Sequence, residues 1–308
     1  MTASQQRMVP PAEPRSYYGR PVIKEPVWTP EIPIYFFTGG LAGASAGLAF
    51  AARLSGRKKL ARVATGNAFA GVAVSPVLLI SDLGVPTRFL NMLRVFKITS
   101  PMSVGSWILS VEGGLLTITA AHEFLGWFPK PLARLVEAVA AFLGMPLATY
   151  TAALIANTSV PIWHDGRKEL PFAFAGGSAM AAGGAAALLA PKEAGPARRL
   201  AIAGAVTEVV AIELSKRKLG EVAEPYKTGT AGRFEKATKV GAAGGAALLG
   251  YSEVARNRRV GMLGSVLAIA GSMCGRWMVF TAGRQSAAAP QYTVGPQRAR
   301  RNANEGHP

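Results

Sequence analysis

Half of the 308 residues are hydrophobic, only 17% are charged, and the mean hydropathy is +0.24. Because soluble domains carry about 25% charged residues, this composition excludes an ordinary soluble protein. The formal net charge of +17 does not indicate nucleic-acid binding, because the basic residues fall in connectors and tails between apolar blocks.

The first 30 residues are rich in proline and lack the apolar core of a cleavable signal peptide. We expect residues 1–30 to form an extended arm that lies on the membrane face or on a partner.

Eight apolar blocks follow, and most approach the roughly 20 helical residues that cross about 30 Å of hydrocarbon. They cover residues 32–54, 63–80, 103–125, 132–156, 170–190, 200–214, 240–254 and 260–282. The sixth and seventh are the weakest, because the sixth contains Glu208 and Glu213 and the seventh is short. Blocks of this length exclude barrel strands. The sequence therefore predicts an all-α integral membrane protein, a bundle of about eight transmembrane helices over residues 31–284, with a flexible polar tail over 285–308.

Glycines occur in clusters in the first, fifth and seventh blocks, as in Gly39, Gly40 and Gly43. Small residues spaced in this way let helix backbones approach closely in lipid. A nucleotide-binding glycine loop would need a preceding strand, and none is predicted. We interpret these glycines as packing residues.

An even number of spans puts both termini on one face, which we call the terminus side. That side also receives the connectors that follow the second, fourth and sixth blocks. It holds more lysines and arginines than the opposite side, which favours termini in the cytoplasm.

The cysteine and histidine counts limit the cofactors. Cys274 is the only cysteine, so the chain alone cannot hold an iron–sulfur cluster or form an internal disulfide. His122 lies near the far end of the third block, His164 in a terminus-side connector and His307 in the tail. Two haem ligands should face each other at similar depth, so we expect no haem.

Several motifs, all on the terminus side or close to it, now allow a comparison. They are WTPEIPIYFFTGG at 28–40, DLGVPTRFLNMLRVFKITSPMSVGSW at 82–107, YT at 150–151 with TSVPIWH at 158–164, ELPF at 169–172, and Arg276 with AG at 282–283. Together they resemble the NrfD/PsrC family, the membrane subunits of polysulfide-reductase-like molybdoenzyme complexes.

The resemblance implies eight or nine helices, a quinone site and docking to a ferredoxin-like iron–sulfur subunit that contacts a molybdopterin or tungstopterin catalytic subunit. The chain would then be the membrane anchor and quinone- or quinol-reactive subunit of a respiratory oxidoreductase in the bacterial plasma membrane. It would exchange electrons with a pool of menaquinone or ubiquinone. A formate-dehydrogenase-type complex would suit the composition.

A quinone headgroup needs hydrogen-bond donors at two carbonyls, a route for protons, and apolar walls. The suitable side chains near the terminus side are Tyr35, Asp82, Tyr150, Trp163 and His164. The aromatic residues and the histidine have plainer alternatives, because Tyr and Trp are common membrane-interface anchors and the histidine lies in a connector.

Residues suited to docking a partner lie on the same side: Trp28, Glu31, Arg88, Arg94 and Lys97. For the tryptophan, anchoring at the membrane interface is the favoured alternative. The arginines are equally well suited to binding lipid phosphates.

Ionisable residues within the blocks carry a sharper hypothesis. A lone charge at the bilayer centre costs roughly 2.5 kcal/mol or more, so such groups usually pair or line a wet cavity. Arg276 is expected to pair with Glu112 or Glu208, either as a proton path to the quinone or as an ion pair that fixes helix packing.

Two other functions remain open from the sequence. The chain would serve equally as a passive anchor without quinone chemistry. A solute or ion transporter would show broken helices in matching repeats. Pro76 and Pro146 interrupt two blocks, but no internal repeat is evident.

Overall fold

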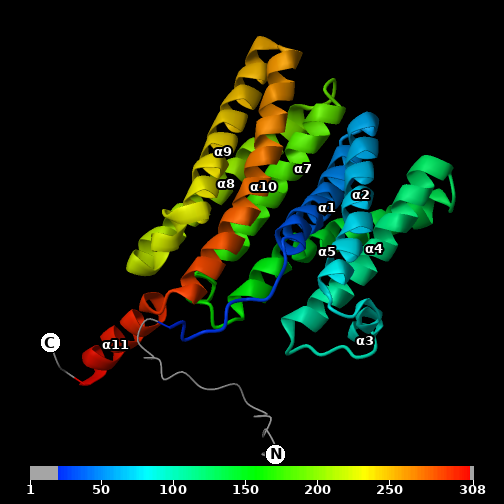
Figure 1. The fold of residues 1–308 in the computed structure, drawn as a ribbon. Helices are drawn as coiled ribbons and strands as arrows, with labels where there is room; N and C mark the ends of the chain where they lie inside the picture. The colour runs from blue at the N-terminus through cyan, green and yellow to red at the C-terminus, as the bar shows by residue number, and fades with distance from the viewer. Residues whose placement is uncertain (1–19, 306–308) are drawn as a thin grey trace, which may run out of the picture.

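The computed structural model describes residues 20–305, and within that range it contains helices and no strands (Figure 1). This confirms the all-α membrane bundle. The eight long helices are α1 (Glu31–Leu54), α2 (Lys58–Asp82), α4 (Pro101–Leu125), α5 (Lys130–Ala156), α7 (Leu170–Leu189), α8 (Gly195–Leu219), α9 (Gly229–Ala255) and α10 (Arg258–Ala288). Shorter elements are η1 (Pro86–Arg88), α3 (Phe89–Met92), α6 (Pro161–Asp165), η2 (Gly220–Tyr226) and α11 (Gln291–Glu305).

Among the described residues, six helices are long and apolar enough to cross a membrane: α1, α2, α4, α5, α7 and α10. The other two long helices, α8 and α9, are the two weak blocks of the sequence. Both have ample length, with 25 and 27 residues, but their charged residues lower their mean hydropathy. The chain is thus a multi-pass membrane protein.

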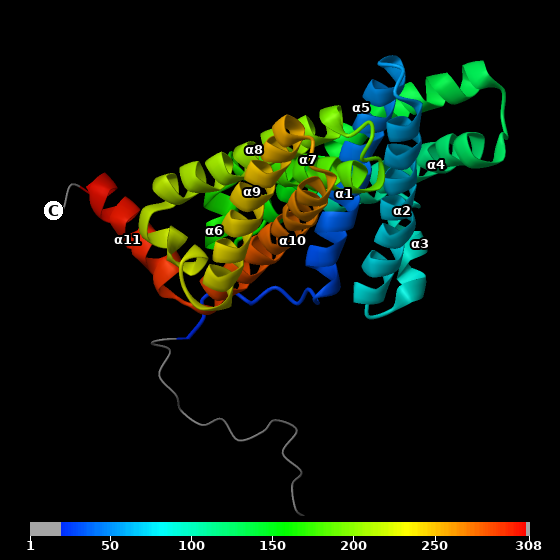
Figure 2. The same ribbon diagram turned by 90° about the horizontal axis from the view of Figure 1, so that it is seen from above.

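The helices alternate in direction, so that their ends form two opposite faces of the bundle (Figure 1). Helix α1 packs on α2, α5 and α7, while α10 packs on α9 and α7. The first described residues, α3 and α11 all lie at the same end. In the view from above, the α4–α5 pair and α11 lie at opposite ends of the molecule (Figure 2).

Glycines allow several helices to touch through their backbones. An ideal Cβ on Gly43 of α1 would overlap the carbonyl oxygen of Gly144 in α5, and the converse also holds. On the other side of the bundle, a Cβ on Gly241 of α9 would lie 2.5 Å from the Cα of Gly271 in α10. Both crossings follow the close approach that small residues allow in lipid.

The two ends of the chain differ from a simple arm and tail. Residues 20–29 contain no helix, and Glu25 in this segment pairs with Arg284 at 2.7 Å. Residues 1–19 of the predicted arm lie outside the described range. From residue 285 on, the described chain is helical except at residues 289 and 290, where the sequence suggested a flexible polar tail. Helix α10 continues through Gly283 to Ala288, and it ends where Ala289 turns extended directly before Pro290.

Candidate functional site

A small cavity lies on the terminus side where the ends of α1, α2, α4 and α5 meet the 83–100 connector. Its volume is about 70 Å³. The wall consists of Trp28, Ile32, Tyr35, Phe36, Leu79, Asp82, Leu83, Phe89, Met92, Met102, Ser106, Tyr150 and Leu154. We call it the aromatic cavity, because five of these side chains are aromatic and only a few are polar.

Tyr35 is the most informative residue of this wall. Its side chain is 1% exposed, and its buried hydroxyl has no hydrogen-bond partner among the described residues. Its ring meets that of Tyr150 edge to face, with centroids 6.5 Å apart. Buried hydroxyls are nearly always hydrogen-bonded, so the Tyr35 hydroxyl is an available donor for a ligand or water in the cavity.

Tyr150 reaches the cavity because α4 carries a glycine opposite it. An ideal Cβ on Gly105 would overlap the Tyr150 ring, so the ring packs directly against the α4 backbone. The two tyrosines thus come from different helices, α1 and α5, and their rings meet in the cavity wall.

Asp82 is the acidic group of the wall, at the last residue of α2. One carboxylate oxygen, Oδ1, accepts hydrogen bonds from the backbone N–H of Thr29 at 2.9 Å and from its hydroxyl at 2.5 Å. Asp82 thereby fastens the segment before α1 to the end of α2, over the cavity. The carboxylate is only partly buried, so it also connects the cavity to the terminus side.

Two of the five predicted quinone ligands lie elsewhere. Trp163 is fully buried, and its Nε1–H donates to the carbonyl of Val279 at 2.8 Å, so it contributes to the core rather than to the cavity wall. It supports the cavity indirectly, since it stacks on Trp28 with centroids 5.7 Å apart. His164 is exposed on α6 and does not line the cavity.

The wall also contains residues that we did not single out from the sequence. Phe89, Met92, Met102 and Ser106 all come from the 82–107 motif, whose elaborate composition was the available signal. The Ser106 hydroxyl donates to the Met102 carbonyl at 2.9 Å, which leaves an apolar surface on this side of the cavity.

The predicted docking residues divide into two groups. Arg88, Arg94 and Lys97 are all exposed on the 83–100 connector. Trp28 instead lines the cavity, and Glu31 is only partly exposed at the start of α1.

A polar centre lies deeper in the bundle, around Arg276 of α10. This side chain is 1% exposed, and its Nη2 donates to the Phe174 carbonyl at 2.7 Å and to the Ser178 hydroxyl at 3.1 Å. The guanidinium also lies over the Phe174 ring, 4.2 Å from the centroid. These contacts bury the cation among α7 and α10.

Of the two acids suggested as partners for Arg276, Glu208 is the one beside it. An ideal Cβ on Gly177 would lie 2.7 Å from Glu208 Oε1 and 2.9 Å from Arg276 Nη2, so the two charges face each other across that glycine. No hydrogen bond joins them, and Glu208 Oε2 has no partner among the described residues. Glu112 in α4 is separate, with both carboxylate oxygens buried and unpartnered within the described part.

Another acid within the predicted spans, Glu137 of α5, is one that sequence reasoning missed. It is 4% exposed and accepts from Arg53 Nε at 2.7 Å, while Arg53 Nη2 donates to Glu123 at 2.8 Å. This cluster joins α1, α4 and α5 on the side opposite the termini. The signal was a charged residue inside the fourth apolar block.

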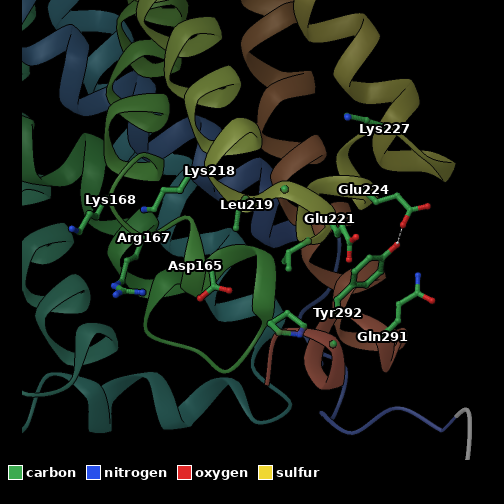
Figure 3. A pocket seen from close by; sticks show the side chains of 14 residues that line it. Asp165, Arg167, Lys168, Lys218, Leu219, Glu221, Glu224, Lys227, Gln291 and Tyr292 are labelled. Atoms are coloured by element: carbon green, nitrogen blue, oxygen red, sulfur yellow. Dashed lines mark hydrogen bonds between the residues drawn. The ribbon is translucent and has the colours of Figure 1, made fainter. Parts of the chain in front are cut away.

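A wide charged cleft of about 1130 Å³ opens on the terminus side between α6, η2 and α11 (Figure 3). Arg167, Lys168 and Lys218 lie along one side of it. On the other, the Tyr292 hydroxyl donates to Glu224 Oε2 at 2.9 Å. Burial, with help from this carboxylate, raises the pKa of Tyr292, so the phenol remains a donor. A cleft of this character suits a polar protein surface better than a quinone.

The metal-binding options are few. Among residues 20–305, no group of three or more His, Cys, Asp or Glu side chains is placed to hold a metal ion. Cys274 carries a free thiol within α10.

A family model described as polysulphide reductase, NrfD matches residues 22–195. The chain belongs to the NrfD family. The matched range runs from the segment before α1 to the first residue of α8, so it contains the whole wall of the aromatic cavity. This family comprises membrane subunits of respiratory molybdoenzyme complexes, which generally partner with iron–sulfur and molybdoenzyme subunits. No curated protein matches the chain.

Proposed function

We propose that this NrfD-family chain is the quinone- or quinol-reactive membrane subunit of a bacterial respiratory oxidoreductase. It exchanges electrons between a partner iron–sulfur subunit and the menaquinone or ubiquinone of the plasma membrane. The observation that carries the proposal is the unsatisfied Tyr35 hydroxyl in the wall of an otherwise apolar, aromatic cavity.

The cavity supplies what quinone chemistry requires of a protein. Reduction of a quinone to a quinol takes up two electrons and two protons. Tyr35 and Tyr150 present phenolic O–H donors for the carbonyl oxygens, and Asp82, at the partly exposed rim, exchanges protons with the terminus side. The electrons arrive from the partner subunit.

The size of the cavity sets a condition on binding. Ligand pockets usually measure about 300–1,000 Å³, whereas this cavity measures about 70 Å³. A headgroup therefore enters only when Phe89, Met92 and Met102 move outward. All three belong to the connector and the first turn of α4, which lie at the edge of the bundle.

We place the partner on the terminus side, in the cytoplasm. Arg88, Arg94 and Lys97 project from the 83–100 connector beside the aromatic cavity, and the charged cleft opens on the same side. A partner with acidic groups near its cluster would bring that cluster over the cavity mouth.

The buried ionisable groups have different roles in this proposal. Arg276 and Glu208 face each other as a charge pair that fixes the packing of α7, α8 and α10. Glu112, which has no partner among the described residues, is the better acid for a proton relay.

The test uses the purified complex and compares Tyr35→Phe with Tyr251→Phe. Tyr251 is 61% exposed at the far end of α9 and serves as a matched control. A lost hydrogen bond of about 1.5 kcal/mol corresponds to roughly a tenfold loss of quinone-linked kcat/KM. We expect that loss for Tyr35→Phe only, with turnover of a soluble electron acceptor unchanged. Normal quinone-linked turnover in Tyr35→Phe would show that Tyr35 does not bind the headgroup, whereas absence of quinone-linked turnover in the unaltered complex would support the passive anchor.

A further inference from the structure

A second apolar hollow lies next to the aromatic cavity, on the outer surface between α2 and α4. Its volume is about 400 Å³. It is lined by Phe69, Val72, Ala73, Pro76, Phe89, Leu93, Leu109, Ser110, Gly113 and Thr117. We call it the α2–α4 groove. Phe89 belongs to both walls, so one side chain separates the groove from the cavity.

The groove presents no free polar group to an occupant. Its two hydroxyls are both directed to their own helix, since Ser110 donates to the Ser106 carbonyl at 2.8 Å and Thr117 donates to the Gly113 carbonyl at 2.7 Å. No charged side chain lines it. An apolar chain is therefore the chemistry that the groove accepts.

The groove runs along the outer surface from the cavity toward the midpoint of α2. At 1.5 Å per residue, the stretch of α2 from Phe69 to Pro76 covers about 10 Å. Phe69 lies near the midpoint of α2, whereas Phe89 lies at the terminus side. Pro76 disrupts the hydrogen bonding of α2 at the groove, which favours a bend there.

We propose that the α2–α4 groove binds the isoprenoid tail of the same quinone whose headgroup occupies the aromatic cavity. Phe89 is then the positioning residue at the junction between ring and tail. This inference rests on the proposed function, and it adds the path by which the quinone reaches its site: from the lipid, between α2 and α4, past Phe89.

Two neighbouring glycines of α4 provide the test. An ideal Cβ on either Gly113 or Gly114 meets nothing within 4 Å, so larger side chains fit at both positions. Only Gly113 lines the groove, whereas Gly114 is exposed. Leucine at either site also improves helix propensity, so folding should be retained.

The experiment measures quinol-linked turnover of the complex with a long-tailed quinol and with a tail-less analogue of the same headgroup. We expect Gly113→Leu to raise KM at least tenfold for the long-tailed quinol and less than twofold for the analogue. Gly114→Leu should change neither. If Gly113→Leu prevents assembly, Ala73→Leu, which fills the groove from α2, decides the question.

The outcomes separate this inference from the proposed function. Equal KM changes for both quinols, or none, would overturn the tail site and leave the groove to membrane lipid. If Tyr35→Phe still lowers turnover in that case, the headgroup proposal stands. If the wild-type complex neither oxidises these quinols nor reduces the corresponding quinones, the proposed function itself fails.

Discussion

Replacing Arg276 with methionine tests whether the polar centre is a coupled charge pair. The substitution keeps an unbranched side chain of similar length but removes the cation that faces Glu208 and the donors to Phe174 and Ser178. Glu208 is 2% exposed, so its carboxylate would stay buried without compensation.

The expected size follows from the burial of both charges. Removing one partner of a buried pair costs about 3–5 kcal/mol in free energy of unfolding. Because Arg276 and Glu208 face each other without a direct hydrogen bond, we expect about 3 kcal/mol for Arg276→Met. Glu208→Gln should cost less, since the guanidinium keeps its contact with the Phe174 carbonyl.

The assay is denaturant unfolding in mixed micelles, followed by tryptophan fluorescence. The double variant Arg276→Met with Glu208→Gln removes both charges. Its loss of unfolding free energy should therefore be smaller than the sum of the two single losses by about 1–2 kcal/mol. Arg259→Met is the matched control, because Arg259 is exposed at the start of the same helix. It should change stability by less than about 0.5 kcal/mol.

Additivity would refute the reasoning. If the double variant loses the sum of the single losses within about 0.5 kcal/mol, the two residues are energetically independent. Arg276 would then stabilise the bundle only through its contacts with α7.

Two further predictions concern packing and the cavity rim. Gly283→Ala would push a methyl group into the Trp163 ring, and such overpacking should lower the free energy of unfolding by about 1–3 kcal/mol. In the control Gly250→Ala the added methyl group meets open space, so the same unfolding assay should show no measurable loss. Asp82→Ala removes both hydrogen bonds from Thr29, so the segment before α1 should be cut faster in limited proteolysis, and an unchanged cutting rate would contradict this role.

The number of long helices could be predicted from the sequence because the length of an apolar block is a strong signal. The residues at which these helices begin and end could not. Helix α2 begins at Lys58, five residues before the predicted block, and α9 begins at Gly229, eleven residues before. Charged residues such as Lys58 are good helix formers, so a helix continues past its apolar stretch. Helices α8 and α9 are hard to recognise for a related reason: their acids lower the hydropathy, although packing buries Glu208 and Glu235.

The candidate site was predictable to the extent that helix direction determines depth. Tyr35, Asp82 and Tyr150 lie near helix ends on the terminus side, so alternating helix directions place them together. Trp163 and His164 lie on the short helix α6, and nothing in the pattern shows which of the two turns inward. The fold turns Trp163 toward α10, where the absence of a side chain at Gly283 leaves room for the indole.

The cavity and the polar centre are connected through the aromatic rings of α1 and α7. Phe36 lines the cavity and packs on Phe174, with ring centroids 5.7 Å apart. The Arg276 guanidinium in turn lies over the Phe174 ring, 4.2 Å from its centroid. Helix α10, which supplies Arg276, follows the range matched by the family model. The matched helices therefore form the wall of the cavity, whereas the helices beyond them hold one side of that wall in place. Loss of Arg276 should consequently loosen Phe36 and weaken the proposed quinone binding, even though α10 contributes no residue to the cavity.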